Sequence, residues 1–549
     1  NSRNFLSIVE LLAEYDPVLK QLVSMPSGSI RYLSHTIQDE LIEILSKHIE
    51  GNIVEEIKTA PFFSVIMDTT QDISKADQMS QIFRYVTIET DERNVATGSF
   101  LGFREICDQS ASELEKKIIS CIEQKGLHIS KCRGQGYDGA SNISGVYSGV
   151  QARISKKEPH TEYVHCIAHN LNLTLNDSVR GIPEVKHFYD VIERLYTFFS
   201  HSIKCWAMLS SFASTLELSS NITLKRLFPT RRSSQYESLL AFRFWYLDIM
   251  KALTKIVLLS KNADEHCEAS TLLQTKILEV VNAVSKLLQS KDTDLYKATK
   301  LLRKATEDLA IFQNNFKEAK NSAITLSEKW GGQTKFEEKC VRKVKCHFDK
   351  LREDERLADS ESFFKVNVFY RCLDIINAQL TNCFQSLQAV ADKFSVIQPN
   401  MLISASDEDL FKEAEKLANH FIKDISPAFP GQLLSFRSCL KSEISKQSSV
   451  KDLANMLIVD NNALASSFSE VCTVLLLFLT IPVTVPSAER SFTKLKLIKN
   501  YLRSTMGQER LHGLGMLSIG NERARKINLQ QIIDEFTEQK ARKMLSIWV

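Results

Sequence analysis

The sequence predicts a mixed α/β core that is interrupted by a large all-helical segment and followed by a helical C-terminal region. Three observations lead to this fold class. Residues 61–190 contain short runs in which apolar and polar residues alternate, which is the pattern of β-strands. Residues 191–455 contain few helix breakers, since no proline lies between Pro229 and Pro399. Residues 456–549 continue with apolar patterns of helical period.

The bulk composition is that of a globular protein with several domains. The chain has 549 residues, of which 44% are hydrophobic and 25% charged, and its formal net charge is only +3. Its 12 cysteines follow no regular spacing, which favours reduced thiols over a disulfide framework. The longest apolar run, Val474 to Ile481, is too short to cross a bilayer, so we expect no membrane partner. Because residue 1 is Asn rather than Met, we expect this sequence to be part of a longer chain.

The first 60 residues are predicted to be helical. The stretch "SHTIQDELIEILSKHIEGNIVEEIKTA" repeats apolar residues at helical spacing. Ile37, Leu41, Ile44 and Leu45 therefore fall on one face of this helix.

The next region is predicted to run in the order strand, strand, strand, helix, strand, helix, strand, helix. Its first helix has Ser110 as a candidate N-cap and Glu113 three residues later, a spacing typical of a capping box. The predicted strands are "FFSVIMD", "SQIFRYVTIET", "NVATGSFLGFREI", "HISKCRGQGYD" and "EYVHCIA". The predicted helices are "SASELEKKIISCIEQKGL", "SGVYSGVQARISKK" and "HNLNLTLNDSV".

These patterns divide the chain into four regions. An N-terminal helical segment spans residues 1–60, and the first part of the core spans residues 61–190. An all-helical insertion is predicted over residues 191–455, and the last core helices over residues 456–549. Within the insertion, the loop "KWGGQTKFEEKCVRKVKCHFDK" carries a basic cluster that is either a solvated surface or a DNA contact.

Two aspartates that follow apolar strands indicate a possible metal site. Asp68 ends "FFSVIMD", and Asp138 ends the glycine-rich "CRGQGYD", whose glycines would let a ligand approach the backbone. Carboxylates at the ends of neighbouring strands can converge on one point, and such hard oxygen ligands suit Mg²⁺ or Mn²⁺. Each aspartate can equally be a turn or capping residue, and Asp72 competes with Asp68 for the functional role.

A third carboxylate is offered by Glu489 in "VPSAERSFTKLKLIKNYL". Ser487 is a plausible N-cap, so Glu489 is expected in the first turn of a helix, where it either binds metal or only complements the helix dipole. Lys494, Lys496 and Lys499 follow on the same helix. An acidic residue at the head of a basic helix suits a site that holds metal beside a phosphate backbone.

These motifs resemble the hAT transposase family, in the subgroup with the DUF4371 domain that includes zinc finger MYM-type protein 1-like proteins. The resemblance rests on "FFSVIMDTTQDIS", "CRGQGYDGASNISGVYSGVQARI", "YVHCIAHNLNL" and the C-terminal "VPSAERSFTKLKLIKNYLRSTMGQERLHGLGMLSI". It covers roughly residues 1–180 and 465–540. It implies a ribonuclease H-like α/β core, a large all-α insertion and a helical C-terminal dimerisation region.

The resemblance also implies roles for individual residues. The family's two catalytic aspartates match Asp68 and Asp138, and its third acidic residue matches Glu489. His169 matches the histidine of the family's Cys-x-x-His motif, which begins here at Cys166, and is expected near the scissile phosphate. From spacing alone, this motif is half of a zinc site without a second pair of ligands.

One motif departs from the family pattern. The family's Thr-Arg-Trp-Ser-Ser appears here as "TRRSS", so that Arg232 replaces a tryptophan associated with stacking on DNA. Arg231 and Arg232 are still expected to contact DNA, together with the lysines of the Glu489 helix. The replacement removes the indole on which the family's hairpin-forming step is expected to depend.

The function implied by the resemblance is DNA strand cleavage and transfer by two Mg²⁺ or Mn²⁺ ions held by the Asp68, Asp138 and Glu489 carboxylates. The implied partners are DNA, in the form of transposon ends, and a second copy of the chain, and the implied location is the nucleus. Two alternatives stay open. One is a domesticated, catalytically inactive nuclear protein that associates with DNA and dimerises, and the other is a ribonuclease H-type nuclease acting on RNA–DNA hybrids.

The expected dimerisation surface is an apolar stripe near the C-terminus. Its members are Leu511, Leu514, Met516 and Leu517. The same stripe is also compatible with plain core packing.

Overall fold

The chain forms two compact units. A computed structural model describes residues 2–26, 32–89, 94–137, 149–165, 182–201, 203–213, 295–329, 360–482 and 486–545, together with single positions between 238 and 252. Unit 1 comprises residues 1–166 and 389–549, and unit 2 comprises residues 167–388.

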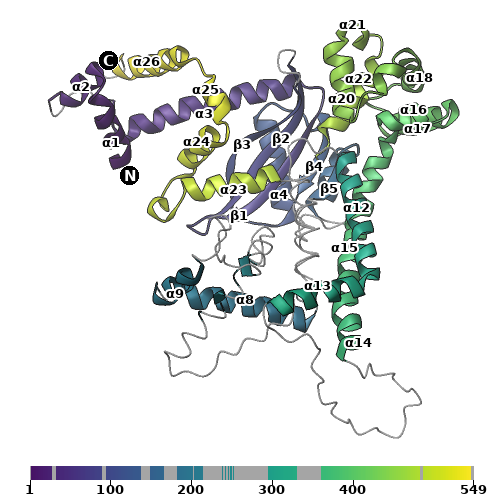
Figure 1. Cartoon of the computed structure of the whole chain (residues 1–549). Helices are drawn as coiled ribbons and strands as arrows, with labels where there is room; N and C mark the ends of the chain where they lie inside the picture. The colour runs from purple at the N-terminus through teal and green to yellow at the C-terminus, as the bar shows by residue number, and fades with distance from the viewer. Residues whose placement is uncertain are drawn as a thin grey trace. The chain divides into compact units, whose positions relative to one another are not determined.

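Unit 1 is built on a five-stranded mixed sheet with the strand order β3-β2-β1-β4-β5 (Figure 1). The first three strands pair antiparallel, whereas β4 and β5 run parallel to β1. The strands are β1 Phe63–Gln71, β2 Asp77–Glu89, β3 Asn94–Ile106, β4 Cys132–Tyr137 and β5 Glu162–His165. Parallel strands need crossover connections, which here contain α4 Ala111–Gln124, η1 Ile129–Lys131 and α6 Val150–Lys157.

The predicted order of strands and helices is confirmed from β1 to β5. The predicted cap is confirmed as well, because the Ser110 hydroxyl accepts a hydrogen bond from the Glu113 amide at 3.4 Å, at the start of α4. The last predicted helix of this region, "HNLNLTLNDSV", lies outside the described residues.

Helices cover both faces of the sheet. Along a strand successive side chains point to opposite faces, so Gln81 and Tyr85 of β2 share one face and Ser80 and Arg84 share the other. Gln81 and Tyr85 bond to Cys121 of α4 and Glu56 of α3. On the opposite face, Arg84 donates to a carbonyl of α22 (Ser469–Thr480) and Ser80 bonds to α23 (Pro486–Ile498).

The N-terminal region is helical, as predicted. Its helices are α1 Ser2–Ala13, α2 Pro17–Ser24 and α3 His35–Thr59. The apolar face expected on α3 is largely confirmed, because Ile37 and Ile44 are buried while Leu41 and Leu45 are half-buried.

Glu50 of α3 joins three elements on its side of the sheet. Its carboxylate accepts hydrogen bonds from Lys125, which follows α4, and from His512 of α24 (Gln508–Ile519), the latter at 3.2 Å. His512 lies against Gly102, whose φ of +115° and lack of a side chain admit the imidazole. Burial disfavours the charged carboxylate, but the bonds from His512 and Lys125 outweigh burial and lower the pKa of Glu50 to about 2.

We expect Glu50→Gln to destabilise unit 1 near neutral pH by about 1–3 kcal/mol. This range is lower than the full free-energy equivalent of the pKa shift, because the Glu50 side chain is 27% exposed and solvent screens its charge. Since the folded pKa lies below the unfolded one, this stabilisation is present above the ordinary pKa of 4.5 and disappears as the pH falls toward 2. Urea unfolding of both proteins at several pH values measures the difference. Glu43→Gln, at an exposed pair with Lys47, is the matched control and should change stability little. A difference for Glu50→Gln that stays constant with pH would contradict this account.

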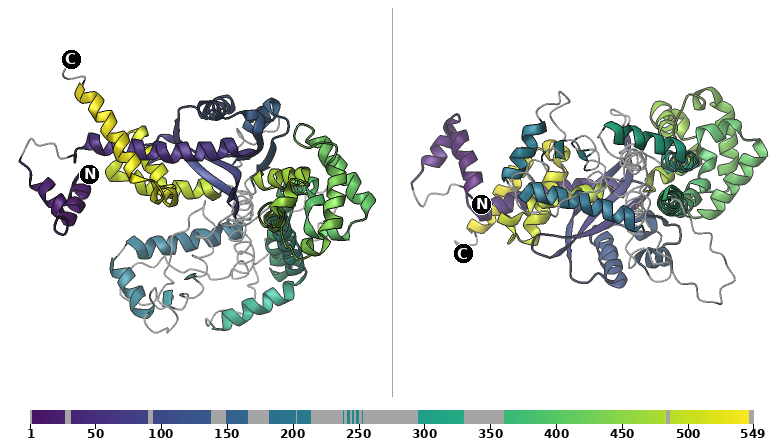
Figure 2. Two further views of the ribbon diagram at one scale, coloured as in Figure 1. Left: turned by 90° about the horizontal axis from the view of Figure 1, so that it is seen from above. Right: turned by 60° about the horizontal axis from the view of Figure 1, so that its bottom comes forward.

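A group of helices in unit 1 lies beside β4 and β5, in green in Figures 1 and 2. Its elements are η3 Ser395–Ile397, α16 Pro399–Ser404, α17 Asp407–His420, α18 Phe429–Cys439, α19 Lys441–Ile444, α20 Val450–Ala454, η4 Asn455–Asp460, α21 Asn462–Ala465 and α22. Phe394 packs against both Phe421 and Phe478, which joins these helices in one core. Residues 389–455, which we expected in the insertion, therefore lie in the same compact unit as the sheet.

The C-terminal part of unit 1 continues after α23 with short helices. These are η5 Tyr501–Arg503, α24, α25 Asn521–Arg525 and α26 Leu529–Leu545. α24 packs against α3 and the edge strand β3.

The described elements of unit 2 are helical. They are α8 Pro183–His201, α9 Ile203–Ala213, α12 Leu295–Asn314, α13 Phe316–Lys329, α14 Ser360–Phe364, η2 Lys365–Tyr370 and α15 Arg371–Lys393, of which the last extends into unit 1. Across the described parts of both units, no helix combines the length and apolarity needed to cross a membrane.

Candidate functional site

Asp68 follows the part of β1 that pairs with β4. Within the described residues, this parallel pairing reaches Met67 and Tyr137, and Asp68 is the next residue of β1. The prediction that the strand ends at Asp68 is wrong, because β1 continues to Gln71. The extra residues stay in the strand because they pair with β2, whose long antiparallel register places Asp68 opposite Ser80.

The Asp68 side chain lies on the face of the sheet that α23 covers. It is half-buried, and one carboxylate oxygen accepts a hydrogen bond from the Thr69 amide at 2.8 Å. Directly opposite residues of an antiparallel pair share a face, so Asp68 lies on the same side as Ser80. Ser491 of α23 donates to the Ser80 hydroxyl at 2.7 Å, which fixes α23 over this part of the sheet.

Glu489 lies in the first turn of α23, two residues before Ser491. The helix begins at Pro486, so the prediction that Ser487 caps it is wrong. Proline is well suited to the first turn of a helix because the amide it lacks has no intrahelical partner there. The first turn of α23, with Glu489 in it, therefore belongs to the same face of the sheet as Asp68.

Several predicted site residues lie outside the described residues. They are Asp138, Cys166, His169, Arg231 and Arg232. Among the side chains that the structure describes, no group of three or more His, Cys, Asp or Glu residues could hold a metal ion.

The glycines before Asp138 have a packing role. A Cβ at Gly134 would overlap the Ser64 hydroxyl and the Pro482 ring, and a Cβ at Gly136 would lie 3.3 Å from Pro482. Gly134 and Gly136 thus admit Pro482, which follows α22, onto β4.

Asp72 has a structural role. One of its carboxylate oxygens accepts hydrogen bonds from the Ser74 amide, the Ser74 hydroxyl and the Ala76 amide, which closes the turn between β1 and β2. The other accepts from Lys499 at 2.7 Å and from Gln78 at 3.3 Å. Burial disfavours the charged form, but the bonds from Lys499 and Ser74 outweigh it and lower the pKa of Asp72. These bonds commit the Asp72 carboxylate to the β1–β2 turn and to Lys499.

Lys499 differs from the two other lysines predicted to contact DNA. Its ammonium forms a buried ion pair with Asp72, whereas Lys494 and Lys496 are exposed on α23. The pairing directs the Lys499 charge into the fold, so we no longer expect this side chain to contact a phosphate.

We expect Lys499→Met to reduce the stability of unit 1 by about 2–3 kcal/mol, because it leaves Asp72 buried without its cation. The cost stays below that of a fully stranded charge because the Ser74 and Gln78 bonds remain. Thermal unfolding measures the change, and Lys496→Met, at an exposed position on α23 just before Lys499, is the control. An equal change in both variants would contradict the ion-pair account.

Two residues of the expected dimerisation stripe lie inside the fold. Leu511 and Met516 of α24 are buried, and Leu514 and Leu517 are half-buried. The glycines of the same helix allow this close packing, because a Cβ at Gly513 would lie 2.6 Å from Ile42 of α3. Leu511 and Met516 therefore serve the core of their own chain, which is the packing alternative stated above.

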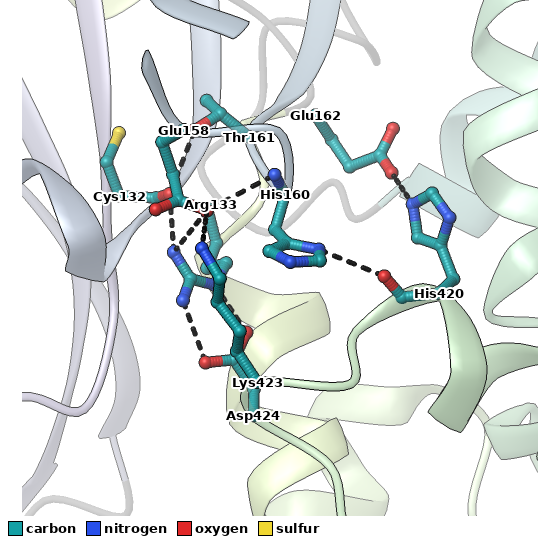
Figure 3. A network of polar contacts seen from close by, with 9 residues as sticks. All are labelled: Cys132, Arg133, Glu158, His160, Thr161, Glu162, His420, Lys423 and Asp424. Carbon is teal, nitrogen blue, oxygen red and sulfur yellow. Dashed lines mark hydrogen bonds and ion pairs between the residues drawn. The ribbon is translucent and has the colours of Figure 1, made fainter. Parts of the chain in front are cut away.

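A buried charge network, for which the sequence has no local signal, surrounds Arg133 of β4 (Figure 3). The Arg133 guanidinium donates to both carboxylate oxygens of Asp424, at 2.5 and 2.8 Å. It lies 3.8 Å from the Glu158 carboxylate and 5.6 Å from the centre of the Phe62 ring. Lys423 approaches Glu158 at 3.7 Å. Arg133 and Glu158 are both nearly inaccessible to solvent. Since Lys423 and Asp424 belong to the loop after α17, their contacts attach this loop to β4 and to the connection that follows α6.

A second cluster extends the network along the connection from α6 to β5 (Figure 3). The His160 ring bonds to the His420 carbonyl at 2.9 Å, and the Thr161 hydroxyl donates to the Cys132 carbonyl at 3.0 Å. One Glu162 oxygen accepts from both Lys393 and His420, at 2.6 and 2.8 Å. Burial disfavours the charged form of Glu162, but the partners outweigh it and lower its pKa. Both clusters join the sheet to the neighbouring helices and are structural in character.

Comparison with known proteins finds two matching families. Residues 1–149 match DUF4371, the RNase-like domain of ZMYM1/FAM200, and residues 432–522 match the hAT family C-terminal dimerisation region. The resemblance predicted from the motifs is thereby confirmed.

Two curated relatives span most of the chain. Both are named "52 kDa repressor of the inhibitor of the protein kinase". The protein from Homo sapiens is 24% identical over 553 residues, which cover 94% of this chain and 69% of the relative. The protein from Mus musculus is 24% identical over 555 residues, which cover 94% of this chain and 70% of the relative.

Proposed function

We propose, since this chain carries the RNase-like and dimerisation domains of hAT-related proteins, that it is a transposase-derived protein that cleaves DNA strands at a two-metal site. The proposed ligands are the carboxylates of Asp68, Asp138 and Glu489. The sheet order and its crossovers support a ribonuclease H-like core, and we propose unit 2 as its helical insertion.

One observation carries this proposal. The hydrogen bond from Ser491 to Ser80 holds the turn of α23 that follows Glu489 over the strand position opposite Asp68. Asp68 and Glu489 lie 421 positions apart in the sequence. Asp68 is on a strand of the sheet, and Glu489 is on the helix that covers that face of the sheet. Such an approach of two acidic positions is what a shared metal site requires.

Asp138 is the proposed third ligand because of its place in the sequence. It follows Tyr137, which pairs with Met67, just as Asp68 follows Met67. Gln135 bonds to the α6 backbone, so Tyr137 at the same parity shares the α6 face. A strand continued by one residue would direct Asp138 to the opposite face, which is the face of Asp68 and α23.

The donor set suits hard divalent cations. Three carboxylates fit Mg²⁺ or Mn²⁺, which when bound would supply activation of a water or 3′-hydroxyl and neutralisation of the leaving oxygen. The chain itself orients the ligands, since the Thr69 amide holds one Asp68 oxygen and the Ser491–Ser80 bond holds α23. Lys494 and Lys496, exposed on the same helix as Glu489, would contact the DNA backbone, as would Arg231 and Arg232. A DNA substrate implies a nuclear location.

Mn²⁺ binding in the presence of a short generic DNA duplex tests the proposal. Titration calorimetry should detect binding to the wild-type protein, weaker binding to Asp138→Asn, and none to Asp68→Asn/Asp138→Asn. Glu509→Gln is a matched control, since Glu509 also lies in the first turn of a helix but on α24. Absence of binding by the wild type, or equal binding by the double variant, would overturn the proposed site.

A second function, regulation without strand cleavage, is supported by two observations. Both curated relatives are named as a repressor of the inhibitor of the protein kinase. In addition, Arg232 stands where the family pattern has a stacking tryptophan. This function predicts a folded, self-associating protein that binds no Mn²⁺ at Asp68, so the same titration separates the two.

A further inference from the structure

Three large apolar side chains at the end of α23 and in the turn that follows it are exposed. Leu497, Tyr501 and Leu502 are exposed by 66%, 84% and 78%, respectively. They lie within six residues of one another, and we call them the apolar turn. A cluster of one aromatic and two large aliphatic side chains in water is unusual for a solvated loop and typical of a contact surface.

The apolar turn is anchored by an ion pair to the sheet and by hydrogen bonds within the turn. Lys499, between its members, forms the buried ion pair with Asp72 of the sheet. The Asn500 side chain accepts a hydrogen bond from the Leu502 amide at 3.1 Å, and the Asn500 carbonyl accepts one from the Arg503 amide at 2.9 Å. A surface that is ordered before binding loses less conformational entropy on association, so these bonds favour a specific contact.

The turn also lies within the segment that matches the hAT dimerisation region, residues 432–522. Leu511 and Met516, in the same segment, are buried in the core of their own chain. In the described part of this segment, the remaining large apolar side chain with substantial exposure is Leu464, at 38%. Within the described part of residues 432–522, the apolar turn is therefore the place where exposed aromatic and large aliphatic side chains, as found in protein interfaces, lie together in the sequence.

We propose that the apolar turn is the surface on which two copies of this chain associate. A second copy would present the same patch, as a two-fold contact requires, so that Tyr501 of each copy packs on Leu497 and Leu502 of the other. This surface is separate from the proposed metal site and does not depend on it.

The salt dependence distinguishes an apolar contact from DNA binding. A contact made by Leu497, Tyr501 and Leu502 contains no opposite charges for salt to screen, so association strengthens or stays unchanged between 50 and 500 mM NaCl. If the apolar turn bound nucleic acid instead, binding would weaken steeply over the same range.

Sedimentation of the full chain over a range of concentrations, without metal or DNA, tests the proposal. Tyr501→Ser/Leu502→Ser should raise the dimer dissociation constant at least tenfold and leave the circular dichroism spectrum and melting temperature unchanged. Leu529→Ser/Ile533→Ser, which changes two similarly exposed apolar residues of α26 outside the matched region, should dissociate as the wild type does. A monomeric wild type, an unaffected Tyr501/Leu502 variant, or a loss confined to DNA binding would each overturn the proposal.

Discussion

Glu489→Gln is expected to reduce Mn²⁺-dependent DNA strand cleavage by at least about 100-fold and to leave the fold intact. The substitution keeps the size of the side chain and removes its charge, so a metal ligand is lost while the first turn of α23 keeps its shape. Ser491 and Ala488, on either side, are buried and hold the helix on the sheet. We therefore expect the melting temperature to change little.

The matched control for this prediction is Glu509→Gln, which removes the acidic residue from the first turn of α24. If Glu489 served only the helix dipole, the two variants would have similar small effects on stability and none on cleavage. Retained cleavage by Glu489→Gln would remove Glu489 from the site, and equal loss in both variants would point to a general effect of charge.

Arg133→Met is expected to lower the opening free energy of β4 and the loop after α17 by about 3–5 kcal/mol. Methionine fills much of the volume, but it leaves the buried carboxylates of Asp424 and Glu158 without their shared cation. Hydrogen exchange resolves this effect locally, because the amides of residues 132–137 and 420–424 should lose protection more than those of β2.

Two further variants define the Arg133 prediction. Arg133→Met/Asp424→Leu removes both partners of the bidentate pair and should recover part of the lost stability, since the stranded charge is the main cost. Arg153→Met breaks a more exposed pair with Glu115 and should cost no more than about 1 kcal/mol. Equal losses in Arg133→Met and Arg153→Met would show that burial of the charges is not what matters.

The sheet could be predicted because its information is local. Alternation of apolar and polar residues marked β3 to its true ends, and the Ser110 cap marked the start of α4. The end of β1 was missed because residues 69–71 are polar, and only pairing with β2 keeps them in the strand. A pattern read along one segment cannot show a partner strand that extends past the apolar run.

The candidate site was predictable only in part, since its decisive contacts join distant residues. Lys499 has the sequence context of a solvated lysine, and its partner Asp72 lies 427 positions away. The pair between Arg133 and Asp424 spans 291 positions and had no local signal. By contrast, Asp68 and Glu489 were named from motifs, and the structure places the backbone of the second on the face of the first.

The most direct test of the central claim, that Asp68, Asp138 and Glu489 share one metal site, is iron-directed cleavage of the protein itself. Fe²⁺ is loaded in place of Mg²⁺, ascorbate and peroxide generate radicals at the bound ion, and the fragments are mapped by mass spectrometry. We expect three groups of cuts, near residues 68, 138 and 489, that excess Mn²⁺ suppresses and Asp68→Asn abolishes. Cuts confined to other segments, or cuts that Asp68→Asn leaves unchanged, would contradict the shared site.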